Sequence, residues 1–115
     1  MTYTFKYEEY HNDYTRRMHE ISFTTLDSAT NWIFNQIQHK WTEGMYFPCR
    51  EPSRIEFQPV FGGPSYWIYM ITSDRGIEFS DGRFTSGQKH WSKDIQNWLS
   101  SCREKQKAPK FTFAE

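Results

Sequence analysis

The chain has 115 residues, and its 14 basic and 14 acidic side chains give a formal net charge of zero at pH 7. This balance argues against a protein that binds mainly through phosphate contacts and against an acidic mimic of nucleic acid. The length fits one domain. Ten Phe, seven Tyr and five Trp residues supply 22 rings, whereas Ile, Leu and Val together number 11. We therefore expect an ordered domain whose core consists mainly of aromatic side chains.

The first part of the chain predicts a β-hairpin followed by a helix. Aromatic and polar residues alternate over residues 2–10. After a short polar turn at 11–13 the alternation resumes over 14–24, with Arg17, His19, Ile21 and Phe23 on one face. Thr25 then offers an N-cap hydroxyl, and Asp27 lies in the first helical turn. Apolar residues at helical spacing predict that this helix continues to residue 41 and faces a sheet: Leu26, Ala29, Ile33, Phe34, Ile37 and Trp41.

Trp32 does not belong to this apolar stripe. At about 100° per residue, its side chain points away from the sheet together with Gln36 and His39. An outward Trp is a candidate contact for a binding partner. The alternative is that the ring lies flat along the border of the helix.

The middle of the chain predicts a loop and three further strands. Gly44, Pro48 and Pro52 indicate a long loop over residues 42–53. Alternation predicts a strand over 54–61, in which Pro59 marks either an edge position or a strand end. Residues 65–72 are apolar on both faces, which predicts a central strand. A tight turn that ends at Gly76 leads into a short strand over 76–80.

The last long element is a predicted helix that ends before Pro109. Its start is ambiguous, because Thr85 with Gln88 matches a capping box whereas Ser92 would cap a shorter helix. Its apolar stripe contains Trp91, Ile95, Trp98, Leu99 and Cys102.

The predicted order β-β-α-β-β-β-α indicates an α+β fold. We expect a single domain over residues 1–107, with an antiparallel sheet of about five strands and two helices on one face. Residues 108–115 form a C-terminal tail that either adds an edge strand or stays loose. The other face of the central strand carries either Tyr66, Ile68 and Met70 or Trp67, Tyr69 and Ile71. That face is then left open or covered only by the tail.

The sequence contains no strong motif for binding a nucleotide or a metal, or for catalysis. The six glycines form no nucleotide-binding pattern, and His11 and His19 lack the close pairing of a zinc site. We therefore expect no enzyme activity, no metal and no cofactor. Cys49 lies beside Arg50, whose charge favours a thiolate, so a Cys49-dependent enzyme is a third hypothesis. Cys102 stands at a core position, where cysteine acts as a small apolar residue.

The sequence shows neither a signal peptide nor an apolar run long enough to span a membrane, so we expect a cytoplasmic protein with no membrane partner. Its general character resembles the small accessory proteins that phages and other mobile elements encode, including inhibitors of host defence complexes.

Binding to a protein is the function that the pattern favours, because Trp, Tyr and Arg are enriched at interface hot spots. Our leading hypothesis is a non-enzymatic module that acts through a protein–protein interface, as an inhibitor or an adaptor. A homodimer formed through the open sheet face or an edge would use the same residues. The alternative is a single-stranded nucleic-acid binder. The candidate partner-binding residues are Tyr10, Tyr14, Arg16, Arg17, Trp32, Phe47, Phe61 and Tyr66.

Overall fold

The computed structural model describes residues 1–12, 14–36, 39–45, 52–59, 62–82, 85 and 87–107. Over these residues the chain forms one antiparallel sheet of seven strands, the last of which has two residues. The strands are β1 (Tyr3–Asn12), β2 (Thr15–Phe23), β3 (His39–Met45), β4 (Pro52–Pro59), β5 (Ser65–Ser73), β6 (Gly76–Ser80) and β7 (His90–Trp91). The helical elements are α1 (Leu26–Asn31), the π-helical turn η1 (Trp32–Gln36) and α2 (Lys93–Lys107). The predicted α+β class is confirmed.

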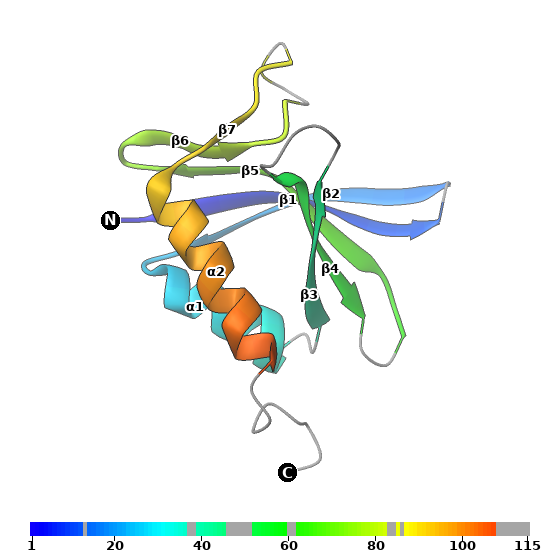
Figure 1. Cartoon of the computed structure of the whole chain (residues 1–115). Helices are drawn as coiled ribbons and strands as arrows, with labels where there is room; N and C mark the ends of the chain where they lie inside the picture. Colours follow the sequence, from blue (N-terminus) through cyan, green and yellow to red (C-terminus); the bar gives the residue numbers. More distant parts are fainter. Residues whose placement is uncertain are drawn as a thin grey trace.

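Strand β5 lies at the centre of the sheet, as predicted. The strand order is β2-β1-β5-β4-β3, and β6 also pairs with β5. One edge of β5 pairs with β1, whereas its other edge is shared by β4, along Tyr66–Ile68, and by β6, along Met70–Ser73. The turn into β6 has its glycine where the backbone requires one, because Gly76 adopts a φ of 111°. Both helices lie on the same side of the sheet (Figure 1).

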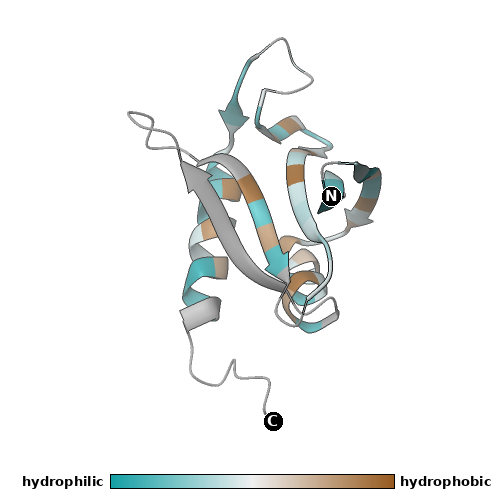
Figure 2. Ribbon diagram, turned by 90° about the vertical axis from the view of Figure 1, so that its right-hand side faces the viewer, coloured by the Kyte–Doolittle hydropathy of each residue, from teal (hydrophilic) through white to brown (hydrophobic). Residues whose placement is uncertain are grey.

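The hydrophobic core lies between the sheet and the helices. Apolar and polar residues alternate along strands of the sheet (Figure 2), and successive residues of a strand face opposite sides of a sheet. Rings supply much of the buried volume, as the composition predicts. The core consists of Tyr3, Phe5, Ala29, Ile33, Phe34, Ile55, Phe57, Ile68, Ile71, Phe79, Ile95, Trp98, Leu99 and Cys102.

A buried hydroxyl joins the two helices. Thr30 of α1 donates a hydrogen bond to the carbonyl of Leu26 (3.2 Å) and accepts one from the Trp98 Nε1 of α2 (2.8 Å). The Trp98 ring also packs edge-on against Phe5, with 5.4 Å between ring centroids. Cys102 is fully buried beside Thr30, which confirms its predicted place in the core.

The first helix is shorter than predicted. Thr25 caps it as expected, because its hydroxyl accepts a hydrogen bond from the Ser28 amide (3.1 Å). The α-helix ends at Asn31, and the chain then continues as η1 and as strand β3. The expectation that Trp41 belongs to the helix is wrong, because Trp41 lies opposite Phe57 in the β3–β4 ladder. A Trp that fits a helical period also suits a strand, and pairing with β4 satisfies its backbone.

The predicted loop over 42–53 is wrong at both ends, because residues 42–45 belong to β3 and residues 52–53 to β4. Pro59 is the last residue of β4, which resolves the alternatives in favour of a strand end. Trp91 does not belong to the last helix, because it pairs with Phe79 in the β6–β7 ladder. The helix begins after Ser92, whose hydroxyl accepts a hydrogen bond from the Ile95 amide (3.3 Å).

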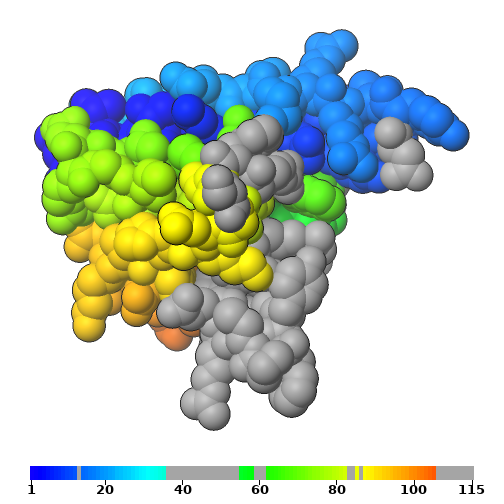
Figure 3. Space-filling view, turned by 90° about the horizontal axis from the view of Figure 1, so that it is seen from above, coloured from blue at the N-terminus to red at the C-terminus, as the bar shows by residue number. Residues whose placement is uncertain are grey.

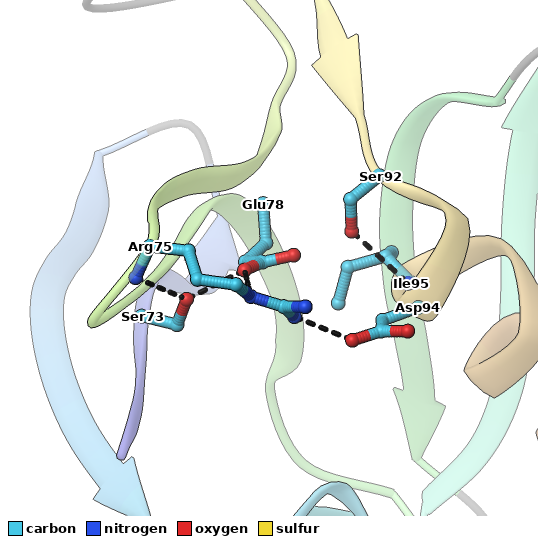
Figure 4. A network of polar contacts seen from close by, with 6 residues as sticks. All are labelled: Ser73, Arg75, Glu78, Ser92, Asp94 and Ile95. Carbon is cyan, nitrogen blue, oxygen red and sulfur yellow. Dashed lines mark hydrogen bonds and ion pairs between the residues drawn. The ribbon is translucent and has the colours of Figure 1, made fainter. Parts of the chain in front are cut away.

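A network of polar side chains ties the β5–β6 turn to the start of α2 (Figure 4). The buried carboxylate of Glu78 accepts hydrogen bonds from the Ser73 hydroxyl (2.5 Å) and from Arg75 Nε (3.0 Å). The same guanidinium forms an ion pair with Asp94 in the first turn of α2. Burial raises the pKa of Glu78, but hydrogen bonds and the Arg75 charge outweigh it and hold the pKa below the ordinary value. The network therefore positions α2 across the core.

Candidate binding surface

Trp32 belongs to the aromatic packing on the helix side of the sheet. Its ring centroid lies 5.4 Å from that of Tyr7 and 6.2 Å from those of Phe57 and Tyr66. The expectation that Trp32 points outward is therefore wrong, and the ring packs at the border of its helix. The helix changes from α to π at Trp32, so the spacing of about 100° per residue that an α-helix would give no longer holds from this residue on. Tyr66 lies in the same cluster, so both residues support the fold.

A second group of rings lies on the opposite side of the sheet, which we call the helix-free face because α1 and α2 cover the other one. There the rings of Tyr10 and Trp67 stack, with 5.5 Å between centroids and 15° between planes. The Arg16 guanidinium lies over the Tyr10 ring, 5.1 Å from its centroid. These three side chains, from β1, β5 and β2, form what we call the Arg16–Tyr10–Trp67 stack.

The strand register explains this arrangement. Phe5 and Tyr7 of β1 face the helices, so period-two alternation turns Glu8 and Tyr10 to the helix-free face. Arg16 is the cross-strand partner of Tyr10, which places its guanidinium within reach of the ring. A guanidinium above an aromatic face is attracted by the ring quadrupole.

Two buried carboxylates flank Trp67 on the same face. Glu8 and Glu56 are its register partners on β1 and β4, with 6% and 9% of their surface exposed. The Glu56 carboxylate accepts hydrogen bonds from Trp67 Nε1 and from Gln58 Nε2, the latter at 2.6 Å. Hydrogen bonds of this kind offset the cost of burying the charge. The Trp67 ring is therefore held in a fixed orientation beside negative charge.

The first hairpin carries a cluster of titratable groups, Glu9, His11 and His19, which we call the Glu9 cluster. It lies on the same side of the sheet as the helices. The two oxygens of the Glu9 carboxylate contact His19 Nε2 (2.5 Å) and His11 Nε2 (2.6 Å). The His19 ring in turn stacks on Tyr7, with 5.2 Å between centroids. Burial raises the pKa of Glu9, but the hydrogen bonds from His19 and His11 outweigh it and lower the pKa. The sequence pattern drew attention to His11 and His19 but not to Glu9, the group that joins them.

The predicted partner-binding residues do not form one site. Tyr10 and Arg16 meet in the stack on the helix-free face. Arg17 is the cross-strand partner of Glu9, and both lie on the face of the sheet that the helices cover. Tyr14 is 97% exposed and projects from the turn. Phe47 and Phe61 lie outside the described residues, as do Cys49 and the tail over 108–115. Trp67 was not predicted as a site residue, although alternation along its strand places Trp67 on the opposite face of the sheet from Tyr66 and Ile68.

A groove of about 570 Å³ lies beside β6 and β7. It is lined by Ile77, Ser80, Thr85, Gln88, Lys89 and His90. The Ser80 hydroxyl contacts the Thr85 hydroxyl (3.0 Å) and accepts a hydrogen bond from the Gly82 amide (3.1 Å), so it stabilises the turn. Among the described residues, no group of three or more His, Cys, Asp or Glu side chains is arranged to hold a metal ion. Within the same residues, neither helix is long and apolar enough to cross a membrane.

The Glu9 cluster predicts a specific pH dependence of stability. The folded-state pKa of Glu9 lies below its ordinary value of 4.5, so ionised Glu9 stabilises the fold above that value. This contribution disappears as the pH falls through the lower, folded-state pKa. We expect Glu9→Gln to lower the free energy of unfolding at pH 6, and the difference from wild type to vanish in strong acid. Urea denaturation across the pH range measures it.

Glu104→Gln, which removes an exposed carboxylate from α2, is the control for this experiment. Its stability should follow the wild-type curve. A Glu9→Gln protein that differs from wild type by the same amount at every pH would show that ionisation of Glu9 does not contribute.

Comparison of the chain with models of protein families, with curated proteins and with solved structures finds no significant match. No activity, ligand or partner is therefore transferred to this chain from another protein. Its function has to be inferred from the helix-free face, the Glu9 cluster and the groove beside β6.

Proposed function

We propose that this protein is a non-enzymatic binding module that contacts a protein partner through the helix-free face. The observation that carries the proposal is the Arg16–Tyr10–Trp67 stack. Arg, Tyr and Trp are the side chains most enriched among interface residues that dominate binding energy. Here one of each is gathered on a sheet face that neither helix covers. A role as an inhibitor or adaptor, such as those of mobile-element proteins, fits because it requires an interface and no reaction.

The stack supports binding because its side chains are already ordered. Ordering a flexible side chain at an interface costs free energy, and preorganisation removes part of that cost. Arg16 is held by the Tyr10 ring, Tyr10 by the Trp67 ring, and Trp67 by its hydrogen bond to Glu56. The surface therefore offers rigid aromatic area together with a cation.

The charges around the stack favour a protein over a nucleic acid. Glu8 and Glu56 lie on either side of Trp67, and Glu20 is exposed on β2 at the same face. Carboxylates repel phosphate groups even when they are buried, whereas a protein partner does not carry the uniform negative charge of a nucleic acid. We therefore rank the protein partner first.

Tyr10→Ala tests this proposal, with Tyr14→Ala as the matched control. Both changes remove a tyrosine ring from the same hairpin, but only Tyr10 belongs to the stack. We expect proteins retained from the native cell lysate by immobilised wild type to be retained by Tyr14→Ala and lost from Tyr10→Ala. Quantitative mass spectrometry measures the retention, and thermal unfolding verifies that both variants fold. Equal retention by all three proteins, or equal loss from both variants, would contradict the proposal.

Single-stranded nucleic acid is the second candidate partner, because bases stack on aromatic rings beside Arg. The stack itself is the observation that favours it. Titration with labelled oligonucleotides at several salt concentrations tests this alternative. Binding that weakens steeply with salt and is lost in Tyr10→Ala supports it, whereas the protein-partner proposal predicts no such binding.

A further inference from the structure

Strand β2 forms one margin of the sheet. It is the terminal strand of the order β2-β1-β5-β4-β3, and within the described residues no strand pairs with its outer edge. In the space-filling view, the blue residues of the first hairpin lie along one side of the molecule (Figure 3). The strand is long, with nine residues from Thr15 to Phe23. A long edge strand presents backbone donors and acceptors that another strand can pair with.

The exposed side chains of β2 on the helix-free face form a self-complementary pattern. Arg16, Met18 and Glu20 alternate to this face, and all three are exposed, Met18 to 49%. The order along the strand is therefore positive, apolar, negative. An antiparallel copy of the same strand, centred on Met18, places each Arg16 opposite the Glu20 of the other copy and the two Met18 side chains opposite each other. Opposite charges in directly paired positions stabilise strand pairing.

The other symmetric registers lack this complementarity. A two-fold axis at Arg17 or at Glu20 places like charges directly opposite each other. An axis at His19 leaves Glu20 opposite Met18 and pairs neither charge. On the far side of the sheet, the Met18-centred register sets Arg17 opposite His19 of the second copy, and both lie next to a Glu9 carboxylate. Charge complementarity therefore selects the axis at Met18.

The cross-strand partners of these residues extend the pattern. Lys6 lies opposite Glu20 within the chain, and Tyr10 lies opposite Arg16. The pairing therefore produces a row across two copies in which Lys6 and Glu20 of one meet Arg16 and Tyr10 of the other. Because Arg16 stacks on Tyr10 through its planar face, the N–H groups at its rim remain suited to a carboxylate.

We propose that the β2 edge pairs with the β2 edge of a second copy of this chain, around a two-fold axis at Met18. The product is an isologous dimer with one continuous sheet. A two-fold axis perpendicular to the sheet keeps both helix-free faces on the same side, so the dimer presents two Arg16–Tyr10–Trp67 stacks to one partner surface. The dimer goes beyond the proposed function and does not depend on it.

Charge reversal at positions 16 and 20 tests the dimer. Arg16→Glu leaves only negative charge at these two positions, and Glu20→Arg leaves only positive charge. We expect wild type to sediment as a dimer in a concentration series, and each single variant to lose the dimer at the same concentrations. An equimolar mixture of the two variants should recover it, as should the double variant Arg16→Glu/Glu20→Arg. Lys105→Glu reverses an exposed charge on α2 and should dimerise like wild type.

Three outcomes would overturn the proposal. The first is a wild type that sediments as a monomer up to millimolar concentration. The second is a dimer that persists in both single variants, which would place the contact elsewhere. The third is protection from hydrogen exchange that does not change on dilution at those β2 amides that do not bond to β1. That result would show that another segment of the same chain, such as residues 108–115, occupies the edge. Circular dichroism verifies folding, and recovery by mixing separates lost pairing from misfolding.

Discussion

The packing of aromatic rings between the sheet and the two helices is the interaction on which the rest of the structure depends. With 22 rings and 11 Ile, Leu and Val residues, the chain has few aliphatic side chains with which to fill a core. Phe5 contacts both Phe23 and Trp98 edge-on, at 5.5 and 5.4 Å between centroids. Edge-to-face pairs of this kind add about 0.5–1.5 kcal/mol each beyond the area that they bury. The rings therefore fix the positions of the helices as well as burying apolar surface.

Alternation along the strands divides the rings between two tasks. Tyr7 and Tyr66 turn to the helix side and hold Trp32, whereas Tyr10 and Trp67, from the same two strands, turn to the other side and stack on each other. Because the helices occupy one face only, the second pair is not required to close the core. A protein that builds its core from rings can thus present further rings for binding at the opposite face.

The sequence predicted secondary structure correctly where the local pattern of apolar and polar residues matches the pairing in the sheet. The hairpin of β1 and β2, the central strand β5 and the short strand β6 follow from period-two alternation and turn residues. Trp41 and Trp91 were misassigned because each stands at a helical spacing next to a helix, whereas the ladders with β4 and β6 decide their conformation. Long-range pairing of that kind leaves no signal in a short window.

The binding surface was predicted only in part, for a similar reason. Tyr10 and Arg16 were both predicted as binding residues, but Trp67 joins them through the β1–β5 register, which sequence spacing does not reveal. Trp32 was assigned to the surface because the projection assumed an α-helix where the chain forms η1. Glu9 joins two histidines from different strands, which again depends on register.

The division of the rings into a structural set and a surface set is the central claim, and the stabilities of two variants test it most directly. The free energies of unfolding of Trp32→Ala and Tyr10→Ala are to be measured by urea denaturation. We expect Trp32→Ala to lose about 3 kcal/mol, because it removes a ring packed against four others, and Tyr10→Ala to lose about 1 kcal/mol or less. Equal losses, or a larger loss for Tyr10→Ala, would contradict the account.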